Sequence, residues 1–241
     1  MSRNLHKLYY KDYFSGIEWN RLNSDNVKEN VERSNKTLTG SQLLCIIDSP
    51  AKDIKGYFRF QQSIIYPGLV TGVGINHEVG IEGEFKLGVH FDWTYGMPVV
   101  YGSSVKGVLR SYFKEFYVPK DNQPTEEEAF NDIFEGSGKS IYDRDIFFDA
   151  VIVKADKKGR ILCSDSITPH KDPLKNPIPI TFMKIAPGCT IEFRFKLVDT
   201  KITKDGKEYV LKAEEKEKLF KEILTTVGVG AKTNVGYGQL K

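Results

Sequence analysis

The order in which strand-like and helix-like segments follow one another constrains this chain most. The stretch CTIEFRFKLVD, residues 189–199, alternates apolar and polar side chains, as a strand with one buried face does. Two stretches instead carry apolar residues at helical spacing, residues 103–117 and residues 213–227, and Gly228 provides a stop for the second. In chain order, the strong elements are expected to be strand 57–66, helix 103–117, strand 145–153, strand 190–199, helix 213–227 and strand 235–240.

This βαββαβ order is typical of the α+β fold called ferredoxin-like or RNA-recognition-like, here with large insertions. The insertions include a glycine-rich region at residues 71–96 with one hairpin-like arm, a short helix ending at Gly136, a strand in RILCSDSIT and a hairpin turn at Asp205–Gly206. Residues 1–55 read as an N-terminal extension of helix and loop, with a short strand in QLLCIID, packed on a domain of residues 56–241.

The composition excludes few functions. Lysine and arginine total 35 and aspartate and glutamate 32, so the net charge of +3 neither establishes nor excludes a nucleic-acid partner. No apolar run reaches the roughly 18 residues of a membrane span, and the first residues resemble no signal peptide. The three cysteines form no CxxC pair. We therefore expect a reduced, cytoplasmic protein without membrane contact.

The start of the helix at residues 103–117 is a candidate anion site. Ser103 and Ser104 are good N-cap residues, and the free N–H groups of a first helical turn attract anions. Lys106 lies where a helix disfavours cations, unless an anion offsets its charge. With Arg110 one turn further on, the stretch could hold two successive backbone phosphates. The alternative is a solvated basic face on an amphipathic helix.

The glycine-rich stretch GVGAKTNVGYGQL, residues 228–240, is a second candidate. Glycines at a helix-to-strand junction allow main-chain N–H groups to approach a bound phosphate closely. A helix C-cap followed by a tight turn is the simpler alternative. The residues of this stretch that could contact a phosphate, a sugar or a base are Gly228, Gly230, Lys232, Thr233, Gly236 and Tyr237, although Tyr237 also suits the core.

The residues do not support catalysis. His77 in the loop NHEVG could act as a base in RNA cleavage, but a lone loop histidine is more often a polar surface contact. Asp149 alternates with apolar residues in a predicted strand, and Asp143 and Asp145 flank the start of that strand, where solvated acids are ordinary. With no nucleophile–base–acid set, no metal-ligand cluster and no phosphate-binding GxxxxGK[ST] motif, we expect neither an enzyme nor a cofactor or metal.

In order along the chain, the motifs resemble those of the RAMP superfamily of CRISPR effector subunits. GMPVVYGSSVKGVLRSYF resembles the family block G-x-P-x-x-P-G-S-S-x-K-G-x-x-R, and the closing stretch resembles the family's C-terminal glycine-rich loop. DIFEGSG, IFFDA and DSITPHKDPLKNPIPITFMKI are similar to the sixth subunit of the Cmr module, the type III-B effector complex. The good matches span residues 67–241, and Tyr101 departs from the pattern by replacing a proline.

The resemblance implies an RNA-recognition-like fold with a β-hairpin thumb within residues 67–96. It implies a non-catalytic subunit that holds the 3′ region of the guide RNA in antiviral defence, with His77 joining the serines and the glycine loop as an RNA contact. The implied partners are guide CRISPR RNA, target RNA, the repeated backbone RAMP subunit, the terminal RAMP subunit and the small helical subunit.

Two other functions stay open. The chain could be a metal-independent RAMP endoribonuclease that processes CRISPR repeat RNA, with His77 or His90 as acid or base. It could also be an assembly module that binds protein neighbours through the aromatic side chains of residues 1–66, which suit either an interface or a satellite core. These side chains are Tyr9, Tyr10, Tyr13, Phe14 and Trp19.

Overall fold

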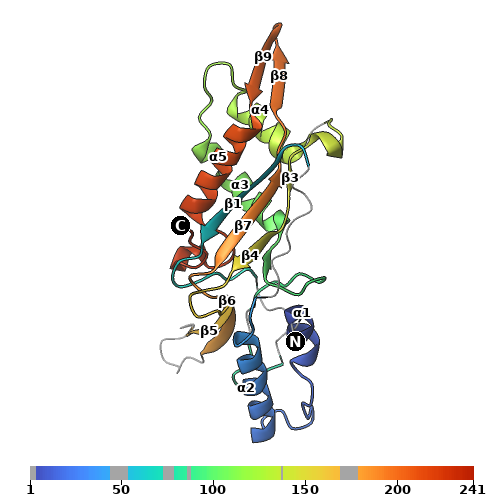
Figure 1. Ribbon diagram of the computed structural model, residues 1–241, viewed down its shortest axis with the longest axis vertical. Helices are drawn as coiled ribbons and strands as arrows, with labels where there is room; N and C mark the ends of the chain where they lie inside the picture. Colours follow the sequence, from blue (N-terminus) through green and yellow to red (C-terminus); the bar gives the residue numbers. More distant parts are fainter. Residues whose placement is uncertain (1–3, 44–53, 73–78, 86–87, 137, 169–178) are drawn as a thin grey trace, which may run out of the picture.

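A central antiparallel sheet forms the body of the protein (Figure 1). The computed structural model describes residues 4–43, 54–72, 79–85, 88–136, 138–168 and 179–241. The strands of the central sheet lie in the order β1 (Tyr57–Ser63), β7 (Thr190–Lys196), β4 (Ala150–Lys154) and β2 (Val99–Val100), and β3 (Ile146–Phe147) also pairs with β7. The protein is thus a mixed α+β molecule with antiparallel sheets, and the first three predicted strands are confirmed.

The two long helices predicted from the sequence cover one face of this sheet. They are α3 (Gly102–Phe116) and α5 (Ala213–Val227), which contact each other behind β1 and β7 (Figure 1). Alternation along β7 turns Phe193 and Phe195 toward the helices, where the ring of Phe195 lies 5.7 Å from that of Phe220 in α5. All three phenylalanine side chains are fully buried, so the alternating pattern located the core face correctly.

The N-terminal segment packs on the sheet region as a helical unit. It contains α1 (Leu5–Lys7), a π-helical turn (Leu8–Asp12) and α2 (Asp25–Thr39). Tyr9 and Tyr13 are buried, and the centre of the Tyr9 ring lies 5.6 Å from that of Phe91. They therefore belong to the core rather than to an exposed interface, whereas Trp19 is 58% exposed. Most of the predicted strand QLLCIID lies outside the described residues.

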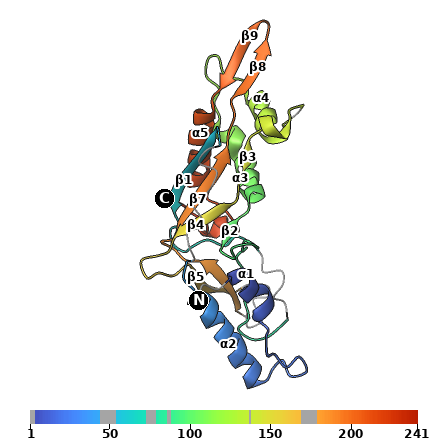
Figure 2. The same ribbon diagram turned by 45° about the vertical axis from the view of Figure 1, so that its right-hand side comes forward.

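Two separate antiparallel pairs and a short helix lie outside the central sheet. β5 (Leu162–Ile167) pairs with β6 (Ile180–Ile185), and β8 (Thr200–Lys204) pairs with β9 (Lys207–Leu211) in a hairpin that projects from the upper end in Figures 1 and 2. The predicted turn is confirmed, since Asp205 and Gly206 both have positive φ, at 48° and 74°. The predicted short helix is α4 (Glu126–Phe130) with a π-helical continuation that ends at Gly136.

The hairpin thumb expected within residues 67–96 is not found in the described part of that range. Residues 67–72, 79–85 and 88–96 contain only isolated bridges, such as that between Gly72 and Gly88, and residues 73–78 and 86–87 lie outside the described residues. A Cβ atom on Gly88 would lie 2.6 Å from the Tyr9 hydroxyl oxygen. Gly88 is therefore held against the N-terminal segment.

The final strand predicted at residues 235–240 is wrong. A short 3-10 helix (Thr233–Val235) and a turn occupy most of that range, and Leu240 forms a single bridge to Ile64. Gly236 and Gly238 have φ values of 94° and 73°, a left-handed backbone that an extended strand excludes.

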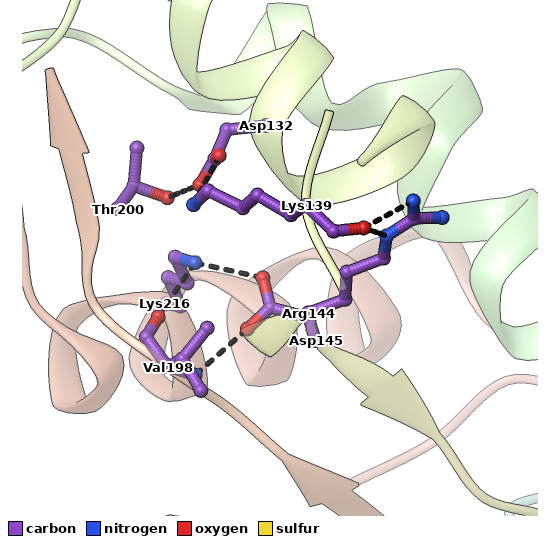
Figure 3. A network of polar contacts seen from close by, with 7 residues as sticks. All are labelled: Asp132, Lys139, Arg144, Asp145, Val198, Thr200 and Lys216. Carbon is purple, nitrogen blue, oxygen red and sulfur yellow. Dashed lines mark hydrogen bonds and ion pairs between the residues drawn. The ribbon is translucent and has the colours of Figure 1, made fainter. Parts of the chain in front are cut away.

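A partly buried polar network joins the base of the projecting hairpin to the rest of the protein (Figure 3). Thr200, the first residue of β8, donates its hydroxyl to Asp132 Oδ2 at 2.5 Å, and Lys139 Nζ lies 2.5 Å from the other oxygen of Asp132. Arg144 in turn donates to the backbone carbonyl of Lys139. None of the helices in the described ranges is both long and apolar enough to cross a membrane.

Candidate nucleic-acid interface

A cavity of about 370 Å³ separates one flank of α3 from the glycine-rich loop. Its wall combines hydroxyl groups and glycine backbone with apolar side chains. The lining residues are Thr71, Ser104, Gly107, Val108, Ser111, Tyr112, Gly230 and Ala231. The structure thus brings together two of the residues predicted from the sequence, Ser104 and Gly230, from opposite ends of the chain.

Helical spacing explains why α3 presents this flank. Val105, Leu109 and Phe113 are buried in the core, which leaves Ser104, Gly107 and Ser111 side by side on an adjacent flank. Gly107 stands in the middle of the helix, and a Cβ atom built on it meets nothing within 4 Å. A glycine there costs about 0.5–1 kcal/mol relative to alanine, and the chain's own packing does not require it.

Sequence reasoning did not single out Gly107, and it also missed the hydroxyl groups of Thr71 and Ser111. The signal of Gly107 was a glycine within an otherwise amphipathic helical pattern, which ordinarily indicates a packing or binding reason. The helix start also differs from the prediction, because α3 begins at Gly102 and Ser103 and Ser104 lie inside its first turn instead of capping it. The Gly102 N–H group donates to Asp149 Oδ1 at 2.7 Å, so a carboxylate of the chain already lies at the positive end of the helix.

Lys106 and Arg110 lie on a different flank of α3 from the cavity. Lys106 Nζ sits 5.8 Å from the centre of the Phe147 ring, and Arg110 forms an ion pair with Glu135 at 2.6 Å. The Arg110 guanidinium also lies over the ring of Phe130. The structure therefore does not place these two cations at the cavity with Ser104 and Gly230.

The glycines of the closing loop are packed against the chain's own backbone. A Cβ atom on Gly230 would lie 2.3 Å from the Val70 carbonyl oxygen, and one on Gly228 would lie 2.6 Å from that of Gly238. Hydrogen bonds from Ala231 to Val70 at 2.7 Å and from Val229 to Gly238 at 2.9 Å fix the same approach. The loop is therefore a wall of the cavity that is fixed by the chain's own backbone. The sequence analysis had predicted that these glycines approach a bound phosphate instead.

The remaining loop candidates differ in exposure. Lys232 is half-buried in a left-handed conformation with φ of 62°, and no ion-pair partner for it occurs among the described residues. Thr233 and Gly236 are half-buried in the 3-10 helix and its cap. Lys232 directly follows Ala231, a lining residue of the cavity, in the chain.

Tyr237 belongs to the core rather than to a base-stacking site. It is only 7% exposed, packs edge-on to Phe182 at 5.7 Å and donates its hydroxyl to Asp165 Oδ2 at 2.8 Å. Burial and the Asp165 carboxylate raise the pKa of Tyr237 to about 12. The Lys184 ammonium, which pairs with Asp165, lies over the ring of Tyr237, so a base has no access to it.

His77, predicted as an RNA contact, lies outside the described residues. His90 is stacked on Tyr101 with ring centres 4.7 Å apart, and a Cβ atom on Gly72 would lie 2.2 Å from its Nε2 atom. Burial lowers the pKa of His90. Its backbone N–H donates to the Thr71 hydroxyl at 2.6 Å, which places His90 directly behind the cavity wall.

The antiparallel sheet and the two helices that cover it define a class of α+β fold that a known structure shares. A chain of a type III-B Cmr-β complex bound to cognate target RNA has the same fold, with 18% identity and a TM-score of 0.56 over 99% of this chain and 85% of that chain. Cmr6 from Pyrococcus furiosus is 19% identical over 78% of this chain and 98% of that chain, with a TM-score of 0.38. No curated protein sequence matches this chain.

The family follows from the sequence model of the RAMP superfamily, which matches residues 50–241. The chain belongs to the RAMP superfamily.

Proposed function

We propose that this chain is a non-catalytic, RNA-binding structural subunit of a type III-B CRISPR effector complex. The 3′ region of the guide RNA would lie in the cavity between α3 and the glycine-rich loop. Membership of the RAMP superfamily and the shared fold with a chain of a Cmr-β complex support the complex. Gly107 carries the assignment of the cavity, because a glycine facing open space in mid-helix is explained by a partner that approaches the helix backbone.

The chemistry of the cavity suits a sugar–phosphate backbone. Ser104, Ser111 and Thr71 provide hydroxyl groups that donate to phosphate oxygens or accept from ribose. Lys232, adjacent to Ala231 on the wall, provides a positive charge without an ion-pair partner in the described ranges. Tyr112 of α3, which is 38% exposed, is the aromatic side chain of this wall.

We also propose the finer fold and domain assignment. The bridge from Leu240 to Ile64 places the C-terminal segment beside β1, so the sheet order is C-terminal segment, β1, β7 and β4. With α3 after β1 and α5 after β7, this is a ferredoxin-like arrangement whose fourth strand is reduced to one bridge. Residues 1–55 would be an extension packed on a RAMP domain of residues 56–241.

The place within the complex is a further part of the proposal. The sequence motifs favour the sixth subunit of the Cmr module, with the repeated backbone RAMP subunit, the terminal RAMP subunit and the small helical subunit as neighbours. Co-expression with each neighbour and mass measurement of the assembled particle tests this. If this chain took the place of the terminal RAMP subunit in the particle, instead of assembling beside it, the chain would be reassigned to the terminal position.

Substitutions at Gly107 test the cavity. Gly107→Ala and Gly107→Gln both introduce good helix formers, so each should raise the free energy of unfolding, by about 0.5–1 kcal/mol for alanine. Gly107→Gln should weaken binding of guide RNA about tenfold, and Gly107→Ala by less, because the larger side chain fills more of the cavity. Weaker binding by a more stable protein excludes misfolding as the cause. Unchanged binding by both variants would remove the cavity from the interface.

The absence of catalysis belongs to the same proposal. His90 supports it, because stacking on Tyr101 and contact with Gly72 hold its ring behind the cavity wall. Incubation of the protein with CRISPR repeat RNA in the presence of a chelator should leave the RNA intact. Specific cleavage that is lost in His77→Ala or His90→Ala would instead establish the metal-independent endoribonuclease.

A further inference from the structure

The described residues that line the cavity between α3 and the glycine-rich loop are all uncharged. Lys106 and Arg110 lie on another flank of α3, and Lys232 follows the lining residue Ala231 without lining the cavity itself. A phosphate enclosed here would lose water without gaining a cation, which is costly. The interior of the cavity therefore suits an uncharged part of a nucleic acid better than it suits a phosphate.

The Ser111 hydroxyl group offers the cavity a hydrogen-bond acceptor. Its O–H group donates to the Gly107 carbonyl, one turn back in α3, at 2.9 Å. A serine hydroxyl has one hydrogen to donate and two lone pairs that accept, so with this hydrogen engaged Ser111 Oγ accepts only. A phosphate oxygen also only accepts, and the two cannot form a hydrogen bond. A group that binds Ser111 from the cavity must therefore bring a hydrogen of its own.

Thr71 presents the opposite polarity on the loop side of the cavity, next to the bridge between Val70 and Ala231. Thr71 Oγ1 accepts the His90 N–H group at 2.6 Å, and within the described ranges no group accepts the hydrogen of the Thr71 hydroxyl. Thr71 is only 7% exposed, and a buried donor without an acceptor is costly. The cavity thus offers an acceptor on α3 and a donor on the loop side.

Apolar surface completes the lining. Val108, Tyr112 and Ala231 contribute apolar side chains to the wall. Gly107 leaves open space beside the helix backbone, since a Cβ atom there would meet nothing within 4 Å. A few placed polar groups on an otherwise apolar wall are typical of a site for a small ring. A sugar ring fits this description, because it has hydroxyl groups at its edge and C–H groups on its faces.

We propose that the cavity holds one ribose of an RNA strand, whose 2′-hydroxyl donates to Ser111 Oγ while another ribose oxygen accepts from the Thr71 hydroxyl. The inference rests on the proposed function, because the strand is the one assigned to this cavity. The 2′-hydroxyl is the only hydrogen-bond donor of a ribose within a strand, and it is what distinguishes RNA from DNA. Ser111 is therefore a residue that selects RNA, and the flanking phosphates lie outside the cavity, one of them beside Lys232.

Two labelled strands of one sequence test this by fluorescence anisotropy. One is single-stranded RNA, and the other is its fully 2′-fluoro counterpart, which has no donor at the 2′ position. The parent protein should bind RNA about fivefold more tightly, the value of one hydrogen bond. Ser111→Ala should bind both strands equally, by losing affinity for RNA alone, and alanine is the better helix former, so the variant should fold. Ser103→Ala, exposed in the same helix and outside the lining, should keep the fivefold preference.

Four results would overturn the inference. Equal affinity of the parent protein for the two strands overturns the ribose site and leaves the proposed function standing. An equal loss of affinity for both strands in Ser111→Ala shows that this hydroxyl contacts a phosphate instead. The parental preference, if retained in Ser111→Ala, places recognition of the 2′-hydroxyl elsewhere. Failure of both strands to bind the parent protein overturns the proposed function together with the ribose site.

Discussion

The Nζ atom of Lys216 lies 2.7 Å from Oδ2 of Asp145, and neither side chain is more than 1% exposed (Figure 3). Lys216 also donates to the Val198 carbonyl at 2.8 Å, while Asp145 accepts the Val198 N–H group at 2.9 Å. Burial lowers the pKa of Lys216 and raises that of Asp145, so removal from water acts against both charges. The pair therefore joins α5 to the segment before β3 at the point where the projecting hairpin begins.

Removing one partner of this pair should be strongly destabilising. Lys216→Met leaves a buried carboxylate without its cation, and we expect the free energy of unfolding to fall by about 3–5 kcal/mol. Lys218→Met, on the exposed side of the same helix, should change it by less than about 0.5 kcal/mol. Urea titration measures both.

The double variant Lys216→Met/Asp145→Leu separates the two contributions of the pair. With both charges removed, most of the lost stability should return, because no uncompensated ion stays buried. A double variant as unstable as Lys216→Met would show that the hydrogen bonds to Val198 matter more than the ion pair.

Acid should weaken the contact between α4 and the projecting hairpin. Hydrogen bonds from Lys204 and from the side chain and backbone of Thr125 lower the pKa of Glu128 to about 2, from an ordinary value of 4.5. As the pH falls, Glu128 is protonated in the unfolded chain before it is protonated in the folded protein. The stability that Glu128 contributes is therefore present above about pH 4.5 and is lost as the pH falls toward 2. Glu128→Gln should therefore flatten the fall in stability over this window.

The matched control for Glu128 is Glu127→Gln. Glu127 is exposed in the same turn, and the described residues offer it no ion-pair partner. Thermal unfolding between pH 7 and pH 2.5 compares the two variants with the parent protein. Equal slopes for Glu128→Gln and the parent would contradict the assignment.

Gly238 should tolerate alanine far less than Gly159 does. Both have positive φ, at 73° and 75°, so a side chain strains the backbone similarly at each position. A Cβ atom on Gly238 would lie 1.8 Å from the Val229 carbonyl oxygen, whereas one on Gly159 meets nothing within 4 Å. We expect about 1 kcal/mol of destabilisation for Gly159→Ala and clearly more for Gly238→Ala. Equal losses in urea unfolding would show that the loop rearranges.

The salt dependence of RNA binding should identify Lys232 as a phosphate contact. Lys232→Gln should lower the slope of log affinity against log salt by about 1, because one released counterion is lost. Arg110→Gln should change the slope less, since Glu135 already neutralises Arg110 at 2.6 Å. A larger effect at Arg110 than at Lys232 would place the RNA across the start of α3 instead.

Local periodicity explains what the sequence could predict. In β7, Ile191, Phe193 and Phe195 are all fully buried, while Glu192 and Arg194 turn to the other face, where they pair at 2.8 Å. The helices α3 and α5 follow their apolar stripes in the same way. Such patterns depend only on neighbours along the chain and on which face is covered.

The parts that could not be predicted depend on contacts between distant residues. Asp145 looked like a solvated acid, yet it is buried and pairs with Lys216, 71 residues away. The sequence suggested that Arg110 could hold a phosphate, but Arg110 forms an ion pair with Glu135. The glycines of the closing loop indicated a close approach correctly, whereas their partner in the structure is the backbone at Val70. The local sequence pattern does not determine which distant residue packs beside a given side chain or glycine.

Ultraviolet crosslinking of the assembled complex, followed by mass spectrometry of RNA-linked peptides, tests the central claim most directly. We predict guide RNA adducts within residues 102–112 and 230–233, the two walls of the cavity. Adducts on the neighbouring subunits, with none on these two peptides, would contradict an RNA-holding role for this chain.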